Sequence, residues 1–399
     1  MEKIYSVIIV GGGASGVLSA IELTQGENKL NGDSVLILEK NDRILKKLIA
    51  TGNGQANLSN ANLTIDNYYG DKSFLNEYFT IKSNFSVEDY FLGLGLPFTT
   101  LLDGRKYPLS RQANAVVDLL RFTLDGRGVN TLTNQTVNSI AYKNGLFAVS
   151  TDKTYLAKKV ILSVGGKASK QFGTDGKSYS LATNFGHKLT TLFPSLVQIK
   201  TEADKIRGLK GIKEVALVTA LDGDKPLKSA TGDLLFTEYG VSGNAVFQIS
   251  GHLASAKNPK IKIEFLPELS KEDIENILIS RKKVFAVLPK EDALIGVLHK
   301  KLGQVMIKTI GSTDPKILAN SLKNFTLTVT GTTGFDNAQV TKGGIATDKV
   351  NPKTMESTLQ KGLYITGEML DIDGDCGGYN LDFAFTSAYL AGKDIKKNI

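Results

Sequence analysis

Two glycine-rich segments near opposite ends of the chain constrain its fold more than any other feature. Near the start, the apolar residues 7–10 run directly into a glycine-rich stretch over residues 11–16. Near the end, residues 362–368 contain another short apolar run, and residues 377–381 open with a glycine pair. Each segment has the pattern of a buried strand that ends at glycines before a helix start. We therefore expect both ends of the chain to enter one α/β sheet and to lie side by side.

The first segment has the pattern of a βαβ unit that binds a dinucleotide. A strand over 5–10 precedes a helix over about 13–23, and a second strand over 34–38 ends at Glu39. Glu39 is placed to accept hydrogen bonds from a ribose diol, which favours FAD or NAD over NADP. Three glycines have separate roles: a tight turn, close approach of a pyrophosphate, and packing of helix on strand. They are Gly11, Gly13 and Gly16.

The second segment places an acidic residue and a helix start near a strand end. Glu368 follows the apolar run, at the carboxyl edge of a strand, where ligands bind in open α/β sheets. The final helix begins after Gly377 and Gly378, and its N-terminus carries a partial positive charge. Reduced flavin is negative at its pyrimidine ring, so a helix start directed there would stabilise it. Together the two segments predict FAD held between two helix N-termini.

Composition limits the other possibilities. The chain has 399 residues, enough for two or three domains, and no apolar run long enough for a membrane-spanning helix. Cys376 is the only cysteine, which excludes an internal disulfide, and the N-terminus leaves no room for a cleavable signal, so we expect a cytoplasmic protein. The net charge of +8 is spread along the chain, which favours a solvated basic surface over a nucleic-acid-binding face. The three histidines lack metal-ligand spacing, so no metal is expected.

The character of the chain changes twice along its length. We expect an α/β, Rossmann-like FAD-binding domain built from both ends of the chain, residues 1–193 and 336–399. Alternating apolar residues predict an inserted β subdomain over 194–268 and 323–335, and a Lys-rich helical pattern predicts an insertion over 269–322. Because no second glycine fingerprint of the first type occurs, a separate domain for a nicotinamide nucleotide is not expected.

Local signals give three further structural predictions. Residues 114–124 have the apolar spacing of an amphipathic helix. Asn144 and Gly145 predict a hairpin turn between strands within 130–150. Ser270, followed three residues later by Asp273, predicts a helix N-terminus.

Several polar residues outside the two segments are candidates for the site. The glycine-broken stretch 43–60 is either a surface loop or a loop around a cofactor, where Asn53 and Asn57 offer amides to a flavin edge. Gly165 and Gly166 close a buried strand and would let the chain pass near the cofactor. The candidates for the substrate side or for capping the flavin are Arg105, Tyr107, Ser110, Glu238 and Tyr239, each of which is equally compatible with a structural role. Cys376 lies near the proposed flavin, although a lone cysteine is more often inert.

Taken together, these segments resemble the BaiN/YhiN-type bacterial flavoproteins, which include the aminoacetone-oxidase-like oxidoreductases. The matching stretches span nearly the whole chain: 7–16, 46–60, 104–110, 160–176, 235–243, 341–345 and 362–381. The resemblance implies a FAD-binding domain from both chain ends, a β-barrel and a helical insertion. This chain departs from the family pattern at Gln55–Ala56, Glu238, Asp375–Cys376 and the shortened stretch 173–176. Inferences about the substrate are affected more than FAD binding, which depends on the backbone and glycines.

The resemblance also implies roles for residues of this chain. Gly11, Gly13 and Gly16 would hold the pyrophosphate, and Glu39 the adenosine ribose. Asn53, Gly54 and Asn57 would lie along the flavin. Gly367 and Glu368 would meet the ribityl-phosphate end, and Gly378, Asn380 and Leu381 the pyrimidine edge. The remaining cofactor-binding candidates are Ala14, Ser15, Lys40, Lys47, Leu48, Val137, Gly165, Gly166 and Tyr379.

These observations predict a FAD-dependent oxidoreductase that transfers hydride through flavin N5, with the β subdomain covering a small-molecule substrate. The resemblance implies either reduction of a conjugated carbon–carbon double bond, with NADH or NADPH as a transient donor, or oxidation of an amine such as aminoacetone with release of hydrogen peroxide. We favour the reductase because nothing in the sequence indicates an oxygen pocket. A flavin enzyme that forms dihydrouridine in ribosomal RNA and a non-enzymatic FAD-binding redox sensor are the alternatives. No membrane partner is expected, and the oligomeric state is left open.

Overall fold

The chain folds into two compact units. The structure, a computed structural model, describes residues 3–284 and 289–399. One unit contains Met1–Leu192 and Val340–Ile399, and the other contains Phe193–Gln339. The first unit is therefore built from both ends of the chain, and the second is inserted between them.

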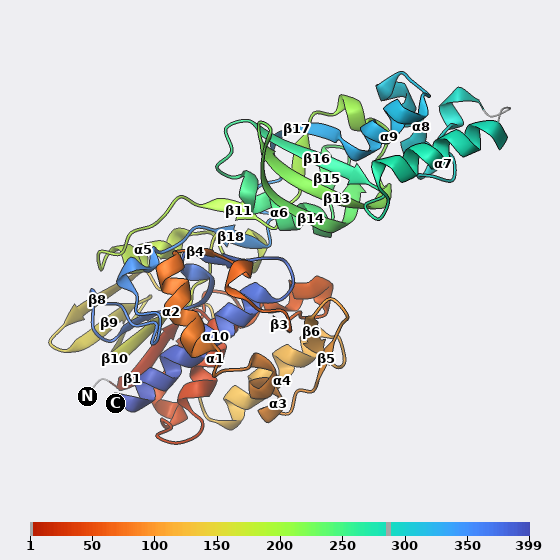
Figure 1. Ribbon diagram of the computed structural model, residues 1–399. Helices are drawn as coiled ribbons and strands as arrows, with labels where there is room; N and C mark the ends of the chain where they lie inside the picture. The colour runs from red at the N-terminus through yellow and green to blue at the C-terminus, as the bar shows by residue number, and fades with distance from the viewer. Residues whose placement is uncertain (1–2, 285–288) are drawn as a thin grey trace. The chain divides into compact units, whose positions relative to one another are not determined.

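A seven-stranded sheet forms the centre of the first unit (Figure 1). Its strands are β1 (Ile4–Val10), β2 (Val35–Leu38), β7 (Asn130–Leu132), β8 (Ser139–Lys143), β9 (Leu146–Ser150), β10 (Thr154–Leu162) and β19 (Leu363–Ile365). The order is β7, β2, β1, β10, β9, β8, and β19 also pairs with β10. The strands β7, β2, β1, β10 and β19 are parallel, whereas β9 and β8 are antiparallel. Because β10 pairs with both β1 and β19, strands from the two chain ends share one sheet, as predicted.

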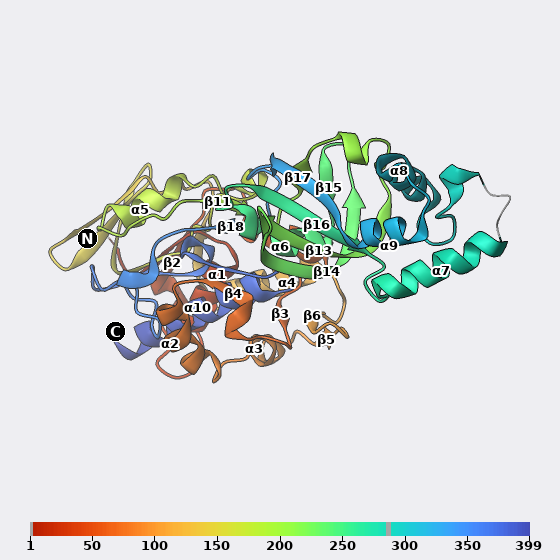
Figure 2. The same cartoon turned by 45° about the horizontal axis from the view of Figure 1, so that its top comes forward.

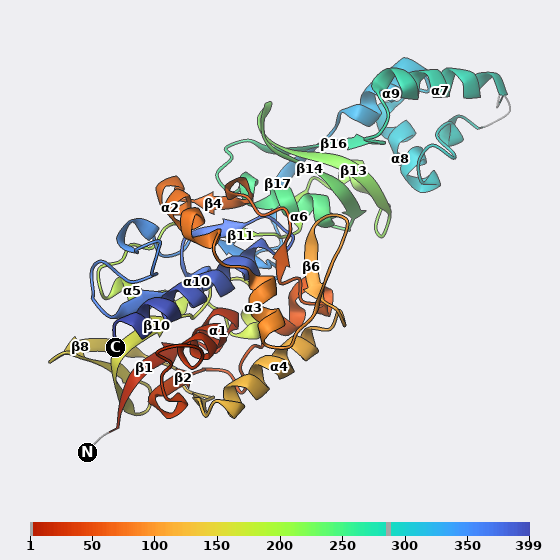
Figure 3. The same cartoon turned by 60° about the horizontal axis from the view of Figure 1, so that its bottom comes forward.

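Helices from both ends of the chain pack together beside this sheet. The helices of this unit are α1 (Ala14–Leu23), α2 (Lys72–Lys82), α3 (Val87–Gly93), α4 (Ala113–Gly126), α5 (Ser180–Thr183) and α10 (Tyr379–Lys397). Figure 3 shows α1 beside α10. The approach is close, because a Cβ atom added at Gly392 would lie 2.7 Å from the Glu22 side chain. A buried ion pair of 2.7 Å joins Lys396 to Glu22 and ties the ends of the two helices together.

Two small sheets bring middle segments of this unit beside its C-terminal part. One contains β5 (Phe98–Thr100), β6 (Arg105–Pro108) and β3 (Ser59–Asn60). The other pairs β4 (Tyr68–Gly70) with β20 (Ile372–Gly374), just before the start of α10. The stretch 59–70 therefore lies along the approach to the last helix.

The second unit contains a closed antiparallel barrel (Figure 2). Its strands are β12 (Ile199–Thr201), β13 (Lys213–Asp222), β14 (Lys225–Phe236), β15 (Gly240–Ser242), β16 (Pro259–Phe265) and β17 (Phe325–Thr332). Helix α6 (Asn244–Ser250) follows β15, and α7 (Lys271–Val284), α8 (Lys300–Ile310) and α9 (Pro315–Lys323) lie between β16 and β17 in the chain. A further short strand of this unit is β11 (Phe193–Ser195), whereas the short strand β18 (Val340–Lys342) belongs to the first unit. The predicted α/β fold with an inserted barrel and helices is confirmed.

The local predictions are confirmed as well. Helix α4 covers the predicted amphipathic stretch, and Asn144 and Gly145, both with positive φ, form the turn between β8 and β9. Ser270 Oγ accepts from the Asp273 amide at 3.0 Å, and Asp273 Oδ2 accepts from the Ser270 amide at 3.0 Å, which makes a capping box. Within residues 3–284 and 289–399, no helix is both long enough and apolar enough to span a membrane.

Candidate flavin-binding site

The glycine turn between β1 and α1 is shaped by close backbone contacts. Gly11 has a φ of +103°, and a Cβ atom there would lie 2.5 Å from the Ser163 carbonyl oxygen. A Cβ atom at Gly16 would lie 1.9 Å from the Gly11 carbonyl oxygen, so a side chain fits at neither position. A Cβ atom added at Gly13, in contrast, would have no atom within 4 Å apart from those of Gly13 and its two neighbours in the chain, among the described residues. The space in front of the α1 N-terminus is open at the position predicted for a pyrophosphate, where free amides and the helix dipole favour an anion.

Glu39 is buried beside this turn. Its Oε2 accepts a hydrogen bond from the Gly12 amide at 2.7 Å, and its Oε1 accepts from the backbone and side-chain nitrogens of Asn41 at 2.8 and 2.7 Å. The carboxylate is thus fixed at the carboxyl end of β2, and its remaining lone pairs can accept from a ribose. The Gln135 amide donates to the Glu39 carbonyl at 2.8 Å, which places the loop containing Val137 along the same edge.

The two ends of the chain meet at α1. Ser15 Oγ donates to Thr366 Oγ1 at 2.8 Å, and Thr366 Oγ1 also contacts Ser163 Oγ at 2.8 Å. Gly367 has a φ of +68°, and a Cβ atom there would lie 3.0 Å from the Ser15 Cβ. The prediction that the opening and closing stretches lie side by side is confirmed by these contacts.

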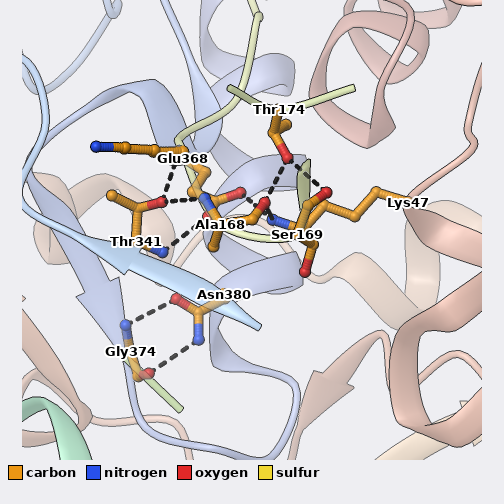
Figure 4. A network of polar contacts seen from close by, with 9 residues as sticks. Lys47, Ala168, Ser169, Thr174, Thr341, Glu368, Gly374 and Asn380 are labelled. Carbon is orange, nitrogen blue, oxygen red and sulfur yellow. Dashed lines mark hydrogen bonds and ion pairs between the residues drawn. The ribbon is translucent and has the colours of Figure 1, made fainter. Parts of the chain in front are cut away.

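Glu368 ties together four segments of the unit (Figure 4). Its Oε2 pairs with Lys47 Nζ at 2.8 Å, and its Oε1 accepts from the Thr341 amide at 3.0 Å. Thr341 Oγ1 in turn accepts from the amides of Lys167 and Ala168 at 2.7 and 2.9 Å. The carboxylate therefore positions the loop after β10 and the 3₁₀ segment after β19. Thr341 begins the stretch 341–345 that matches the family pattern, but nothing in the sequence around it indicates this contact with Glu368.

The loop after β10 depends on its glycine pair. Gly165 has a φ of +74°, and a Cβ atom at Gly166 would lie 2.4 Å from Thr341 Oγ1. Thr174 Oγ1 donates to the Ala168 and Ser169 carbonyls and closes the loop from the other side (Figure 4). Lys40 pairs with Asp175 at 3.4 Å, so the shortened stretch 173–176 contacts the residue after Glu39.

A buried side-chain oxygen without a hydrogen-bond partner in the described part of the chain lies beside the start of α10. Gly378, with a φ of +100°, precedes the helix, and a Cβ atom there would lie 2.3 Å from the Ser59 carbonyl oxygen and 2.8 Å from Asn57 Oδ1. Asn57 is only 8% exposed, and its Oδ1 has no hydrogen-bond partner in the described part of the chain. The first amides of the helix also lack helical acceptors. Because buried polar atoms are almost always paired, this region fits a polar ligand such as a flavin pyrimidine ring.

The predicted pyrimidine-edge residues differ in what their side chains do. Asn380 Oδ1 accepts from the Gly374 amide and its Nδ2 donates to the Gly374 carbonyl, both at 2.8 Å (Figure 4). This side chain therefore holds the loop before α10, and only the backbone amide of Asn380 is left for a ligand. The Tyr379 carbonyl accepts from Tyr68 Oη at 3.1 Å, and Leu381 packs against the core.

A buried ion pair lies behind the first turn of α10. Asp382, which is fully buried, pairs with Lys82 Nζ at 3.1 Å through Oδ1 and accepts from Ser59 Oγ at 2.6 Å through Oδ2. Ser59 thereby fixes β3 close to Gly378. Sequence reasoning misses this contact because neither Lys82 nor Asp382 belongs to a recognisable motif.

The loop over η2 (Leu48–Gly54) is partly exposed. Leu48 is buried in the core, whereas Asn53 and Gly54, both with positive φ, are exposed, and a Cβ atom at Gly54 would have no neighbour within 4 Å. Asn57 lies beyond this loop, inside the protein. The flavin-contacting roles of Asn53 and Gly54 therefore stay predictions.

The HI0933-like protein Rossmann domain family matches residues 5–394 of the chain. A curated relative from Clostridium scindens, a 3-dehydro-bile acid delta(4,6)-reductase, is 37% identical over 96% of this chain and 97% of its own length. The chain belongs to the HI0933-like family. The resemblance that the sequence predicts is confirmed.

Two other relatives are enzymes of a different activity. The ribosomal RNA dihydrouridine synthase of Haemophilus influenzae is 29% identical over the full length of both chains. That of Escherichia coli is 25% identical over 99% of this chain and 98% of its own. The family match and the reductase relative confirm the predicted enzyme class, a FAD-dependent oxidoreductase. The substrate and the electron donor of this HI0933-like protein stay predictions.

Solved structures support the fold of the HI0933-like chain. A 3-ketosteroid-delta4-(5alpha)-dehydrogenase from Rhodococcus jostii has a TM-score of 0.53 at 15% identity and covers 99% of this chain and 98% of its own. A 3-ketosteroid delta1-dehydrogenase from Sterolibacterium denitrificans has a TM-score of 0.52 at 14% identity, over 99% and 100%. At this identity the likeness shows a shared fold.

The catalytic candidates of this HI0933-like protein fall in both units. Arg105 and Tyr107 lie in β6 of the first unit, where Arg105 Nη1 donates to Tyr107 Oη at 3.3 Å. Glu238 and Tyr239 lie between β14 and β15 of the second unit, and Glu238 pairs with Lys210 at 2.6 Å on an exposed surface. Catalytic roles for all four stay predictions.

Cys376 and the histidines give no sign of a metal site. Burial raises the pKa of the Cys376 thiol to about 11, which agrees with an inert cysteine. His187 is buried after the end of α5, with its Nε2 2.8 Å from Ser357 Oγ. Across residues 3–284 and 289–399, no group of three His, Cys, Asp or Glu side chains is arranged to hold a metal ion.

Proposed function

We propose that this protein is a FAD-dependent reductase of a conjugated carbon–carbon double bond in a small molecule. The observation that carries the proposal is the presence of two helix N-termini in one unit, each beside a feature that suits a part of FAD. The open space at Gly13 faces the start of α1, and the unpartnered Asn57 oxygen lies beside the start of α10. The 37% identity to a 3-dehydro-bile acid delta(4,6)-reductase supports the reaction class.

The residues of the first unit fit FAD from end to end. The α1 amides and Gly13 would hold the pyrophosphate, Glu39 the adenosine ribose, and Asn57 and the α10 amides the pyrimidine ring. Glu368 and Lys47 would lie near the ribityl chain. When bound and reduced by an electron donor such as NADH or NADPH, FAD would supply a hydride from N5. The remaining steps depend on side chains of the protein.

Tyr107 is suited to donate the proton that completes the reduction. Burial raises the pKa of Tyr107, although the nearby Arg105 opposes the shift, so the phenol stays neutral at pH 7. The Arg105 hydrogen bond is accepted by the phenol oxygen, which leaves the phenol hydrogen free for a substrate. Tyr107 would place this proton on the substrate carbon next to the carbonyl group, and Arg105 would orient the phenol.

An anaerobic titration tests the proposal. The yellow holoprotein is first reduced with NADH or NADPH and then mixed with a conjugated ketone, and the return of flavin absorbance is followed. Tyr107→Phe should keep FAD and its reduction but slow reoxidation by the ketone about 100-fold. Bleaching by aminoacetone alone, followed by peroxide release in air, would instead identify an amine oxidase. No reaction with any of these would favour the redox sensor.

A second candidate function is dihydrouridine formation in ribosomal RNA. Two relatives carry this name, and the net charge of +8 is compatible with a polyanionic substrate. Affinity for ribosomal RNA that falls steeply with salt would support it. An absence of measurable RNA binding at low salt would remove it.

A further inference from the structure

Two arginines lie beside the ring of Tyr107. The Arg105 guanidinium carbon is 6.0 Å from the centre of the ring, and that of Arg111 is 5.8 Å from it. Arg105 precedes Tyr107 in β6, and Arg111 follows the turn at the end of the strand. The phenol of the proposed proton donor is therefore accompanied by two positive charges.

The two charges differ in how they are balanced. Arg105 Nε pairs with Asp103 at 2.7 Å, and its Nη1 donates to the phenol, so its charge is compensated within the protein. Arg111 is exposed and has neither an ion pair nor a side-chain hydrogen bond within the described residues. The cluster of Asp103, Arg105, Tyr107 and Arg111 therefore keeps one uncompensated guanidinium.

The backbone fixes Arg111 in an unusual conformation. Its φ is +51°, a left-handed value that is uncommon for a residue other than glycine, and its amide donates to the Pro108 carbonyl at 2.8 Å. A strained position of this kind is frequent at ligand-binding sites. The turn thereby holds the base of the Arg111 side chain next to the ring.

The cluster lies against the proposed flavin site. A Cβ atom at Gly52 would lie 3.2 Å from the Tyr107 ring and 2.8 Å from the backbone nitrogen of Asn57. Arg105 faces Asn60 across the β3–β6 pair, and Asn60 Nδ2 donates to the Gly377 carbonyl at 2.9 Å, just before α10. Tyr107 and its arginines thus belong to the same side of the unit as the start of α10.

We propose that Arg111 binds a carboxylate of the substrate and that the protein selects carboxylate-bearing conjugated ketones over neutral ones. A guanidinium can hold a carboxylate through two parallel hydrogen bonds, which adds geometric selection to charge. Arg105 and Asp103 keep the phenol in place, and Arg111 anchors the acid group. The assignment of the reacting molecule rests on the proposed function, whereas the anion site itself can be measured without turnover.

Binding of benzoate and benzamide to the holoprotein tests this site. The two probes have the same ring and differ in charge, and each is detected by the change it causes in the flavin spectrum. Benzoate should bind at least about tenfold more tightly than benzamide, and Arg111→Gln should weaken benzoate about tenfold or more without changing benzamide. Arg111→Lys should recover part of the loss, since it restores charge but not the two parallel bonds.

A matched control and a second variant make the result decisive. Arg121→Gln removes another exposed arginine, on α4, and should leave both affinities unchanged. Arg111→Gly accepts the positive φ, so it removes the guanidinium without strain if the Gln variant folds poorly. Equal binding of the two probes, no benzoate binding, or an Arg111→Gln effect no larger than that of Arg121→Gln would overturn the proposal.

Turnover and RNA binding separate this proposal from the function it extends. If benzoate selection depends on Arg111 but no conjugated ketone reoxidises the flavin, the reductase assignment fails and the anion site stands. If Arg111→Gln leaves benzoate binding intact but lowers affinity for ribosomal RNA, the arginine contacts phosphate and the carboxylate assignment is wrong.

Discussion

The starts of α1 and α10 are two helix N-termini in the same unit, yet they are built in different ways. At α1 the backbone alone shapes the site, because side chains at Gly11 and Gly16 would collide with carbonyl oxygens. At α10, three side chains from distant segments lie beside the start of the helix: Asn57, and also Ser59 and Lys82, which both bind Asp382 of the first turn. The first site is thus a local property of a few consecutive residues, whereas the second exists only after the chain has folded.

Gly13→Val gives the largest expected effect on FAD binding. The φ of −79° at Gly13 allows any residue, and the space around it is open, so the variant should fold with an unchanged unfolding free energy. A valine side chain would occupy the proposed pyrophosphate position, with a cost of at least about 3 kcal/mol, or roughly 100-fold in the Kd for FAD. The ratio of flavin to protein absorbance and a urea unfolding curve of the apoprotein measure both quantities.

Gly16→Ala is the matched control at the same turn. Its Cβ atom would lie 1.9 Å from the Gly11 carbonyl oxygen, so this smaller change should destabilise the fold itself. If Gly13→Val keeps its full yellow colour, the pyrophosphate does not lie at α1 and the comparison between the two helix starts collapses.

The same difference explains how much the sequence reveals. The βαβ unit, the strand 363–365, the hairpin at Asn144 and the cap at Ser270 follow from consecutive residues, and all are present in the structure. The sequence also predicts the site at the start of α1, because the spacing of the glycines there indicates the backbone conformation of the turn. The side-chain bonds of Asn380 could not be foreseen, since they close on Gly374 instead of facing a ligand.

Contacts between remote segments are the part that sequence reasoning misses. Lys82, Thr341 and Asp382 each have an ordinary local pattern, and their roles depend on which segment lies opposite. A single sequence contains no record of such pairing. The domain boundaries that the sequence predicts near residues 193 and 336 also stay predictions.

Lys82→Met tests whether the polar contacts behind α10 hold that site together. It would leave the buried carboxylate of Asp382 without its cation, and removing one partner of a buried pair costs about 3–5 kcal/mol in unfolding free energy. Urea unfolding of the apoprotein measures this loss. Lys82→Met/Asp382→Asn should recover part of it, and Arg207→Met, which breaks an exposed pair with Asp204, should have no measurable effect. Full stability in Lys82→Met would show that the contacts are dispensable.

The reactivity of Cys376 tests which effect sets the pKa of its thiol: burial, which raises it, or the positive end of the nearby helix α10, which would lower it. Burial raises the pKa of its thiol to about 11, although Arg105 opposes the shift. At pH 8 the thiolate fraction should therefore be roughly 100-fold lower than for a thiol with an ordinary pKa. Because Cys376 is the only cysteine, its reaction with a chromogenic disulfide reports it alone, and the urea-unfolded protein is the reference. Equal rates in the folded and unfolded protein would contradict the expectation.

Asn57→Ala separates ligand binding from folding at α10, and its expected effect is the smallest. Asn57 Oδ1 has no hydrogen-bond partner in the described part of the protein. Its removal therefore breaks no hydrogen bond of this oxygen and should not lower the unfolding free energy of the apoprotein on that account. If the flavin pairs with this oxygen, the Kd for FAD should rise about tenfold. Asn60→Ala is the contrasting variant, because Asn60 donates to Gly377 and accepts from the Asn62 amide, and its loss should destabilise the apoprotein. A fall in stability for Asn57→Ala with unchanged FAD affinity would make this amide structural and leave the α10 site without its side-chain contact to the cofactor.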